Sequence, residues 1–391
     1  MAIGEVQSGT RMKTAAVLAL ILATSCVVSS PRPPLKTAAM RLERDVRFLA
    51  SDEMKGRDNA TPEGAAAGDY MARRMAEAGL QPAGEKGTWF QTIPGRKGDR
   101  GRNVIGALPG SADSWVVIGA HYDGLGVRRG AIHNGADDNA SGAAVLLEVA
   151  RRLKDEPRGH GYLFCSFDAE EDGLVGSTHF VNSGLYATEK LVAMICLDLV
   201  GGSFLPGDER RVFALGSESS DLLFGMIGSE REKKGPIELE RLGIYAIEPF
   251  GALMARSDYS PFRLKKVPFV FLSTGTPWYY HTAQDDMERL DFGKMEAVAA
   301  LVSRLAENLS CHIVNPAWRT PAPDLVEDAR QMAAACRRVL EHPAIRASDR
   351  LRASVAKALE ELGPGGEGGV KAVQRAVAVL FELAAAQKPA H

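Results

Sequence analysis

The sequence lacks an excess of charge of either sign. Its 391 residues include 47 lysines and arginines and 49 aspartates and glutamates, so the formal net charge is −2. A nucleic-acid-binding domain usually gathers Lys and Arg on one face and is basic overall. Here both signs are spread along the chain, which excludes the electrostatic footprint of a nucleic-acid partner. The 45% of hydrophobic residues is ordinary for a globular chain and excludes the disordered class.

Cysteine is also scarce, with five residues in the whole chain. Cys165 and Cys196 lie inside apolar runs, so we expect small buried hydrophobic residues rather than ligands or nucleophiles. Cys311 and Cys336 could form a disulfide in an exported protein. Two cysteines do not define a disulfide framework, however, and the sequence leaves their pairing open.

The N-terminal region has no hydrophobic run long enough to span a membrane. Its apolar run, residues 15–23, is short and follows Arg11 and Lys13, which is the pattern of an export signal over about residues 1–30. Cys26 follows Leu-Ala-Thr-Ser, which resembles a bacterial lipoprotein signal. We therefore expect an exported protein that is either lipid-anchored to a membrane through Cys26 or released by ordinary signal cleavage. Its place would be the bacterial periplasm, the outer envelope or the medium.

Strand-like and helical patterns alternate between residues 35 and 311. The strand-like runs are continuously apolar, as expected for strands covered by helices on both faces. Thr61 followed by Pro62 is a typical helix start, and Gly79 a typical stop. We predict an α/β domain over 35–311, with a mixed, mainly parallel central sheet and helices on both faces. The main predicted strands lie at 103–108, 115–120, 162–167, 191–197, 212–215 and 267–272, and the main helices at 141–153, 177–182, 219–233 and 293–308.

Residues 320–391 repeat an amphipathic pattern three times. Apolar residues recur every three or four positions at 325–339, 351–362 and 370–380, and a glycine-rich break over 363–369 separates the last two. Each pattern predicts a helix with one apolar face. We expect a small C-terminal helical appendage that packs on itself or on the α/β domain and carries no chemistry of its own.

Histidines and carboxylates recur where the predicted strands end or the chain turns. In an open α/β sheet, ligands bind beyond the carboxyl ends of the strands. Clustered carboxylates repel one another unless a cation lies between them, and carboxylates with imidazoles suit zinc. One carboxylate that offers an oxygen to each of two ions could hold a pair about 3.5 to 4 Å apart. The residues in question are His121, Asp123, Asp137, Asp138, Glu170, Glu171, Asp198 and His281.

Each of these motifs is weak by itself. A histidine at a strand end is more often structural, an Asp-Asp pair is common in turns, and most acidic runs are solvated. Their joint occurrence at one predicted edge favours a site. Period-2 geometry places His121 and Asp123 on the same side of an extended segment, so Asp123 would accept the imidazole N–H that a metal leaves free. The other histidines, including His133, are expected to be structural or exposed.

The whole set of motifs resembles the co-catalytic di-zinc aminopeptidases, the family that includes bacterial leucyl aminopeptidase and aminopeptidase Y. The resemblance covers about residues 40 to 310 and implies the zinc exopeptidase fold, which is phosphorylase/hydrolase-like. The motifs on which the resemblance rests are Leu49-Ala50-Ser51-Asp52, Gly56-Arg57, Gly119-Ala120-His121-Tyr122-Asp123, Gly135-Ala136-Asp137-Asp138-Asn139-Ala140-Ser141-Gly142, Ala169-Glu170-Glu171, Leu197-Asp198, Ser257-Asp258 and Tyr280-His281-Thr282.

The resemblance implies two Zn²⁺ ions and a role for each polar residue. Glu170 would be the general base, taking a proton from a water held between the metals. Asp138 would follow its neighbour through a strained peptide, which in this family is often cis. The implied ligands are His121 and Asp198 for one zinc, Glu171 and His281 for the other, and Asp137 as the bridge between them.

Two positions depart from many bacterial relatives of that family. Tyr259 follows Asp258 where a His is common, and Gly124 follows Asp123 where a His is frequent. Neither position is a metal ligand in the family, so the implied metal site is unaffected. The candidates for substrate contacts are Tyr280, Tyr259 and Arg256.

These expectations favour an exported zinc metallo-aminopeptidase that hydrolyses N-terminal residues from peptide substrates. A glutaminyl cyclase is one alternative, since it has the same fold and uses one zinc for acyl transfer, but Asp138 stands where cyclases usually have a non-acidic residue. A carboxypeptidase is another, with an arginine such as Arg256 binding the substrate carboxylate. A non-enzymatic module that has lost its metals is disfavoured because all implied ligands are present. The sequence leaves the residue preference and the oligomeric state open.

Overall fold

A computed structural model of the chain describes residues 37–95, 98–244, 256–311, 315–321, 325–363 and 369–388. The predicted export signal, residues 1–30 with Cys26, lies outside these ranges. Within them, no helix is both long enough and apolar enough to cross a membrane.

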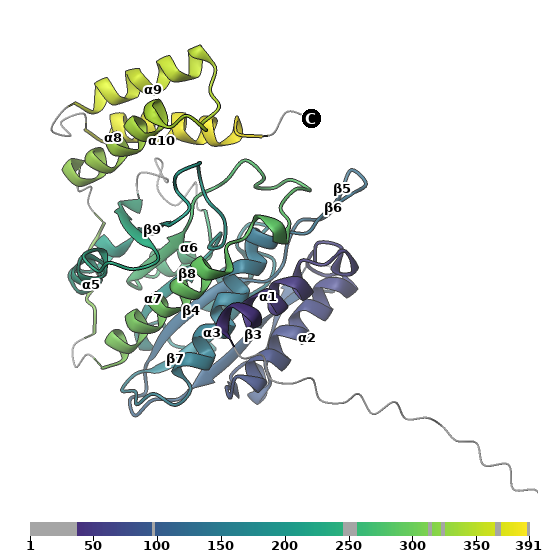
Figure 1. Cartoon of the computed structure of the whole chain (residues 1–391). Helices are drawn as coiled ribbons and strands as arrows, with labels where there is room; N and C mark the ends of the chain where they lie inside the picture. Colours follow the sequence, from purple (N-terminus) through teal and green to yellow (C-terminus); the bar gives the residue numbers. More distant parts are fainter. Residues whose placement is uncertain are drawn as a thin grey trace, which may run out of the picture. The chain divides into compact units, whose positions relative to one another are not determined.

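The centre of the fold is a nine-stranded sheet (Figure 1). Its strands are β1 (Gln81–Pro82), β2 (Phe90–Gly95), β3 (Gly98–Leu108), β4 (Trp115–His121), β7 (Gly161–Phe167), β8 (Leu191–Leu197), β9 (Arg211–Leu215), β10 (Glu238–Leu242) and β11 (Phe269–Ser273). Their order is β1-β3-β7-β4-β8-β11-β9-β10, with β2 paired to β3. The central strands β7, β4, β8 and β11 are parallel, and antiparallel pairs join β3 to β7 and β9 to β11. The predicted mixed, mainly parallel sheet is confirmed.

Helices cover both faces of the sheet, as predicted. The helices of the α/β region are α1 (Ala38–Leu49), α2 (Pro62–Glu77), α3 (Gly142–Leu153), α4 (Val175–Asn182), α5 (Asp221–Arg231), α6 (Tyr259–Leu264) and α7 (Phe292–Cys311). Successive strand residues point to opposite faces. Val116 and Ile118 of β4 therefore pack in one core, with α1, α2, α3 and α7, which gather on one side of the sheet in Figure 1. Val117 packs in the other core, with residues of α4 and α6.

Local sequence explains several boundaries. The Thr61 hydroxyl accepts a hydrogen bond from the Gly64 N–H at 3.0 Å, and Pro62 is the first residue of α2. Gly79, just beyond the end of α2, has φ 89°, which only glycine adopts without strain. Both predicted helix signals are confirmed.

The cysteines of the described chain are all free. Cys165 in β7 and Cys196 in β8 are fully buried, which confirms their predicted role as core residues. Cys311 is exposed and Cys336 buried, and no disulfide joins them.

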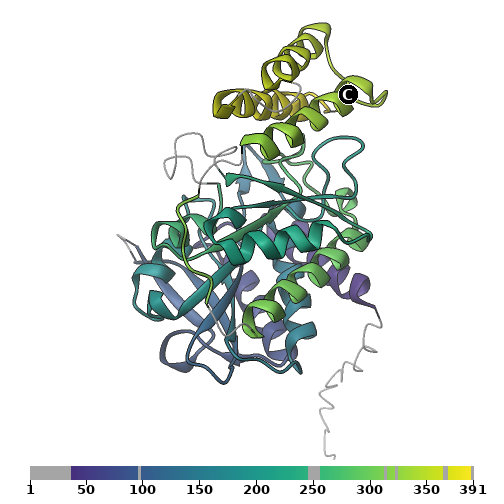
Figure 2. The ribbon, with the colours of Figure 1, turned by 90° about the vertical axis from the view of Figure 1, so that its left-hand side faces the viewer.

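Three helices follow the α/β region, namely α8 (Leu325–Glu341), α9 (Asp349–Leu362) and α10 (Gly369–Ala385). They pack on one another in a small group, yellow-green in Figure 2. Helix α8 also contacts the α/β region: the Gly243 N–H donates to Asp328 at 2.9 Å, and Arg231 pairs with Glu327 at 2.9 Å. The C-terminal helices thus pack both on themselves and on the α/β region.

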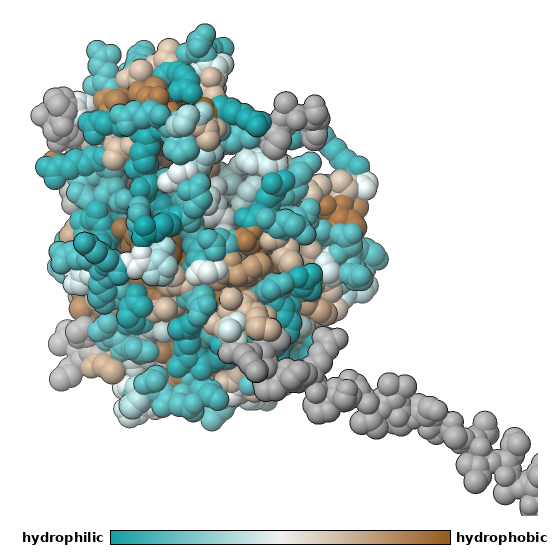
Figure 3. All heavy atoms as spheres, viewed as in Figure 1, coloured by the Kyte–Doolittle hydropathy of each residue, from teal (hydrophilic) through white to brown (hydrophobic). Residues whose placement is uncertain are grey.

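The face of the molecule in Figure 3 is mostly hydrophilic, with smaller hydrophobic areas between the polar ones. Among the described residues, the exposed large hydrophobic side chains are Met40, Val127, Leu264 and Val326. Apolar residues exposed singly are normal on a folded protein and do not mark an interface.

Candidate metal centre

The parallel strands bring the predicted ligands to one edge of the sheet. His121 is the last residue of β4, Glu170 and Glu171 follow β7, and Asp198 follows β8 directly. Because these strands are parallel neighbours, their carboxyl ends meet at the same edge. His281 reaches that edge from the segment after β11.

Asp138 completes the site from the turn that leads into α3. This turn, Ala136–Ser141, is labelled η3 and is irregular: Asp138 has φ −108° and ψ 89°, which are not helical values. The irregular backbone lets successive side chains point in different directions. The position of each carboxylate in the Asp137-Asp138 pair therefore depends on this local conformation.

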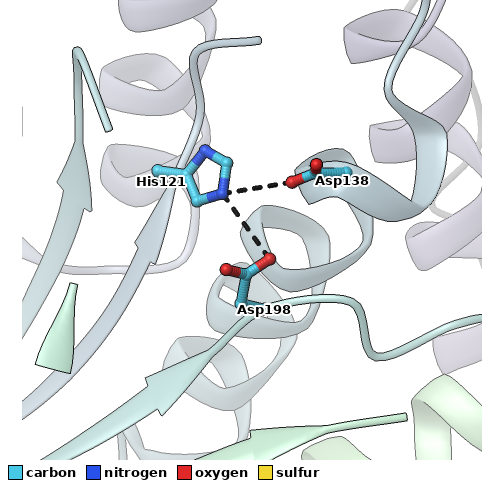
Figure 4. A group of neighbouring side chains, drawn as sticks. All are labelled: His121, Asp138 and Asp198. Carbon is cyan, nitrogen blue, oxygen red and sulfur yellow. Dashed lines mark ion pairs between the residues drawn. The ribbon is translucent and has the colours of Figure 1, made fainter. Parts of the chain in front are cut away.

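The first group of possible ligands is His121, Asp138 and Asp198 (Figure 4). The His121 Nε2 lies 3.4 Å from Asp138 Oδ1 and 3.5 Å from Asp198 Oδ1. All three residues are buried. Three side chains from three separate segments thus point at one position.

The second group shares Asp138 with the first and adds Glu171 and His281. The His281 Nε2 lies 3.1 Å from Asp138 Oδ2 and 3.4 Å from Glu171 Oε2. Asp138 therefore turns one oxygen toward each group. This is the arrangement expected of a carboxylate that bridges two metal ions.

The bridging role predicted for Asp137 is wrong, because its side chain points away from both groups. Asp137 is fully buried, and its Oδ1 accepts hydrogen bonds from the N–H groups of Gly201 and Gly202 at 2.9 and 3.1 Å. The Tyr279 hydroxyl donates to its Oδ2 at 3.2 Å. Asp137 ties η3 to the segment after β8. The cis peptide bond also lies one residue later than expected, between Asp138 and Asn139.

Two buried residues hold the backbone around Asp138. The carboxylate of Asp285 accepts the N–H groups of Asp137 at 2.8 Å and Asp138 at 3.0 Å. The guanidinium of Arg57 donates to the carbonyl oxygens of Gly135 at 2.6 Å and Asp138 at 3.2 Å. Neither role was predicted from the sequence. Arg57 stood only in the Gly56-Arg57 motif, and the only signal for Asp285 was its position four residues after His281.

Asp123 orients residues on both sides of the site. Its Oδ1 lies 3.5 Å from the His121 Nδ1, an ion-pair contact rather than a conventional hydrogen bond. Its carboxylate also accepts the backbone N–H groups of Glu170 at 3.1 Å and Glu171 at 3.3 Å. Asp123 therefore fixes the chain that presents the two glutamates. The Glu170 Oε2 lies 3.9 Å from the His121 Nε2.

Burial dominates the electrostatics of the site. Burial raises the pKa of Asp198 and Glu170, and it raises the pKa of Glu171 and Asp258 to about 7. Burial opposes the charged form of His281 too, but hydrogen bonds with Asp138 and Glu171 outweigh it and raise its pKa to about 10. In Asp138, hydrogen bonds with the two histidines overcome burial and lower the pKa. The carboxylates of the site thus outnumber the basic groups beside them.

Two ligand atoms of the first group have no conventional hydrogen-bond partner in the described structure. They are the Nε2 of His121 and the Oδ1 of Asp198, which lie 3.5 Å apart. Buried polar atoms are rarely left without partners. Two imidazoles and three carboxylates are also a donor set that zinc accepts. The set of donor groups and the ligand atoms without hydrogen-bond partners together fit two zinc ions.

The three residues predicted to contact the substrate lie in different environments. The Tyr280 ring stacks on the His281 ring, with centroids 3.8 Å apart, and so lies at the site. Arg256 is exposed, and its guanidinium lies 5.6 Å from the Phe381 ring. Tyr259 is fully buried and stacks on Phe269 at 5.0 Å, so it is a core residue and cannot contact a substrate.

One histidine that was expected to be structural or exposed lies near the site. His133 lies in the small β5–β6 hairpin (Gly126–Arg128 and Ala131–His133) and lines a narrow cavity with Asp138, Glu171 and His281. It is partly buried. Its nearness depends on the hairpin, which no sequence signal predicted.

The comparison with family models decides the affiliation of the chain. The model of peptidase family M28 matches residues 103–306, a span that contains β4, β7, β8 and every ligand candidate. The chain belongs to peptidase family M28.

Individual relatives of this M28 chain agree with that affiliation. Aminopeptidase YwaD of Bacillus subtilis is 28% identical over 231 residues, which are 55% of this chain and 46% of that protein. The first curated relatives are matched over about half of their own length. The aminopeptidase LapA of Legionella pneumophila has a similar fold, with a TM-score of 0.57 and 20% identity over 71% of this chain and 73% of that one.

A third structural neighbour of the M28 chain is a cyclase rather than an aminopeptidase. The glutaminyl cyclase of Porphyromonas gingivalis superposes with a TM-score of 0.53 and 22% identity, over 69% of this chain and 96% of that one. At these identities the likeness is one of fold. The choice between the two chemistries depends on the residues of the site.

Proposed function

We propose that this chain is a zinc aminopeptidase that removes the first residue from peptides with a free amino terminus. The observation that carries the proposal is the position of Asp138 between two ligand groups. Each of its oxygens faces a different imidazole, at 3.4 and 3.1 Å. A single-zinc cyclase needs only one such group, whereas hydrolysis by a metal pair needs both.

Each zinc would have two ligands of its own and would share Asp138. His121 and Asp198 would hold one ion, and Glu171 and His281 the other. Zinc in such a pair supplies Lewis acidity and lowers the pKa of water at the site. The family and the 28% identity to an aminopeptidase support this assignment.

Glu170 would act as the general base. Burial raises its pKa, and a base works best when its pKa lies near the working pH. Asp123 holds the backbone N–H groups of Glu170 and Glu171, so it would keep base and ligand in fixed relative positions. It would also fix the imidazole of His121 through Nδ1.

Export is part of the proposal and is supported by the sequence of residues 1–30 alone. The basic residues, the short apolar run and Cys26 favour a protein that crosses the inner membrane and carries a lipid anchor or is released. Labelling of the expressed full chain with a radioactive fatty acid, compared with a Cys26→Ala variant, tests the anchor. Incorporation into both chains or into neither would exclude it.

A panel of substrates tests the activity. It contains aminoacyl reporters, their N-acetylated forms, C-terminally amidated peptides and glutaminyl peptides, each assayed with zinc and with a chelator. We expect release from free-amine substrates that is lost on acetylation, unaffected by amidation and abolished by the chelator. Pyroglutamate formation without hydrolysis would establish the cyclase instead, and a need for a free carboxylate would establish a carboxypeptidase.

A further inference from the structure

A cavity of about 110 Å³ adjoins the metal centre and shares Asp198 and Tyr280 with it. A cavity needs only about 10 to 15 Å³ on this measure to hold one water. The space is therefore large enough for an organic side chain. Its floor is formed by β9, β10 and β11, and its other walls by the segment after β8 and by helices α8 and α10.

The walls of this cavity are mainly apolar. Phe213 and Phe271 come from the sheet, Met332 from α8, and Val377 and Phe381 from α10. A pocket of this composition selects for an apolar side chain, because burying apolar surface is favourable and burying an unpaired polar group is costly.

The charged side chains along the cavity have partners of their own. Asp208 pairs with Arg211 at 2.7 Å and with Arg338 of α8 at 3.5 Å. Glu240 lies 3.5 Å from Arg211. The acidic groups are thus paired with arginines, and two further arginines of the lining, Arg241 and Arg256, lie over the rings of Phe224 and Phe381. A basic side chain would therefore find no unpaired carboxylate among the described residues of the cavity apart from the ligand Asp198.

The C-terminal helices are fixed to the segment that begins at the ligand Asp198. The Phe204 ring meets the Phe381 ring edge to face, with centroids 5.5 Å apart, and meets Phe213 at 6.4 Å. The ion pair between Asp208 and Arg338 adds a second connection. The segment from Asp198 to Asp208 thus links one metal ligand to the helical wall of the cavity.

We propose that α8 and α10 form the far wall of a specificity pocket, which accepts the apolar side chain of the first residue of the substrate. This inference rests on the proposed aminopeptidase function. The side chain is one carbon away from the carbonyl that must lie at the metals, so a cavity bounded by Asp198 and Tyr280 is within its reach. Residues 320–391 would then set substrate selectivity.

The test narrows the pocket and compares selectivities. Ala335 of α8 lines the cavity, whereas Ala378 of α10 is exposed on the outer face of the same helical group. Ala335→Leu and its matched control Ala378→Leu are assayed in the full chain with leucyl, phenylalanyl and alanyl reporters. Ala335→Leu should lower the ratio of kcat/KM for leucyl over alanyl substrate about tenfold or more, because one or two methylenes are worth that factor in an apolar pocket. Ala378→Leu should leave the ratio within about twofold.

A second variant enlarges the same pocket. Phe381→Ala should raise the ratio of phenylalanyl over leucyl turnover, and zinc content should equal that of the wild type in both variants. If the wild type is active but Ala335→Leu, Phe381→Ala and Ala378→Leu have equal ratios of kcat/KM between the reporters, the proposed pocket is wrong and the proposed function still stands. A change confined to the second residue of dipeptide substrates would also overturn the proposed pocket. A wild type without chelator-sensitive release would overturn the proposed function and the pocket with it.

Discussion

Two clusters of buried carboxylates in this protein are neutralised in different ways. In the arginine-paired cluster between α1, α2 and α3, the side chains of Asp45 and Glu148 are 0% and 1% exposed. Arg74 and Arg151 lie 3.2 and 3.0 Å from Asp45, and Arg41 donates two hydrogen bonds to Glu148 at 2.7 and 2.8 Å. The chain itself supplies the positive charge there.

The metal cluster has carboxylate side chains that are 7% to 12% exposed, but no arginine is paired with them in the described structure. Arg57 is buried beside it and donates to the backbone oxygens of Tyr122, Gly135 and Asp138 instead. A buried charge is costly unless it is paired or coordinates a metal. A structural cluster of buried carboxylates therefore differs from a ligand site in the partners of its carboxylates, not in their number.

Removal of the shared carboxylate should have the largest effect. Asp138→Asn weakens both ligand groups at once, and metal Lewis acids contribute several kcal/mol of transition-state stabilisation, so kcat/KM should fall by about 10⁴-fold or more. Asp137→Asn is the matched control. Its amide can still accept the N–H groups of Gly201 and Gly202, and loss of about one hydrogen bond predicts less than about a tenfold decrease. If steady-state kinetics showed that Asp137→Asn lowers kcat/KM more than Asp138→Asn does, our assignment of Asp138 as the shared ligand would be wrong.

The next largest effect should distinguish the proposed base, Glu170, from the proposed ligand, Glu171. Glu170→Gln removes proton transfer and leaves the ligands in place, so turnover should fall about 10²- to 10⁴-fold with zinc content intact. Glu171→Gln should instead lower zinc content. Parallel metal analysis and kinetics on both variants check this, and equal zinc loss in the two would refute the division of roles.

In the arginine-paired cluster, the corresponding change should affect stability alone. Glu148→Gln removes the buried negative charge that pairs with Arg41, Arg151 and Arg152 and should lower the free energy of unfolding by about 2 kcal/mol. That is below the range of about 3 to 5 kcal/mol for fully buried pairs, because Arg41 is 26% exposed. Zinc content and kcat/KM should equal those of the wild type. The surface pair of Glu43 and Arg47 supplies the control, since Glu43→Gln should cost less than about 1 kcal/mol in urea unfolding.

The smallest expected effect is a pH dependence of the stability of the metal-free protein. Burial raises the pKa of Glu171 and Asp258 to about 7 in the metal-free protein. An acid with a raised pKa stabilises the fold while protonated, and this contribution is lost as the pH rises from about 4 through 7. Stability of the chelated protein should therefore fall over this range.

The zinc-loaded protein should resist that fall, because the metals pair with the ionised carboxylates. The gap in Tm between zinc-loaded and chelated protein should widen from pH 5.5 to pH 7.5. It should widen by roughly 2 to 4 °C for each kcal/mol of unfolding free energy that the chelated protein loses. Differential scanning fluorimetry at both pH values measures it. A gap that stays constant would mean that these carboxylates gain no cationic partner.

Much of the fold and site followed from the sequence. Continuous apolar runs indicated β4, β7 and β8, and parallel strands necessarily bring their ends together. The strand ends thus indicated His121, the Glu170-Glu171 pair and Asp198, and the family resemblance implied that Glu171 and His281 are ligands. The structure brings His121, Asp198, Glu171 and His281 together in two groups that share Asp138.

The failures have a common physical cause. Whether Asp137 or Asp138 faces the site depends on the irregular backbone of η3, and no periodicity in the sequence encodes those angles. Tyr259 was predicted from its place beside Asp258, but it packs on Phe269 and Phe271 of β11, the strand that follows α6. The cavity wall formed by Phe381 likewise depends on how α10 packs. Each failure concerns the direction of a side chain set by tertiary contacts.

The zinc stoichiometry of the full chain tests the central claim most directly. The protein is saturated with zinc, freed of unbound metal and analysed by inductively coupled plasma mass spectrometry, beside Asp138→Asn and Asp137→Asn. Our account predicts two zinc ions per chain in the wild type and in Asp137→Asn, and at most one in Asp138→Asn. One zinc per wild-type chain, or two in Asp138→Asn, would contradict a metal pair that shares Asp138.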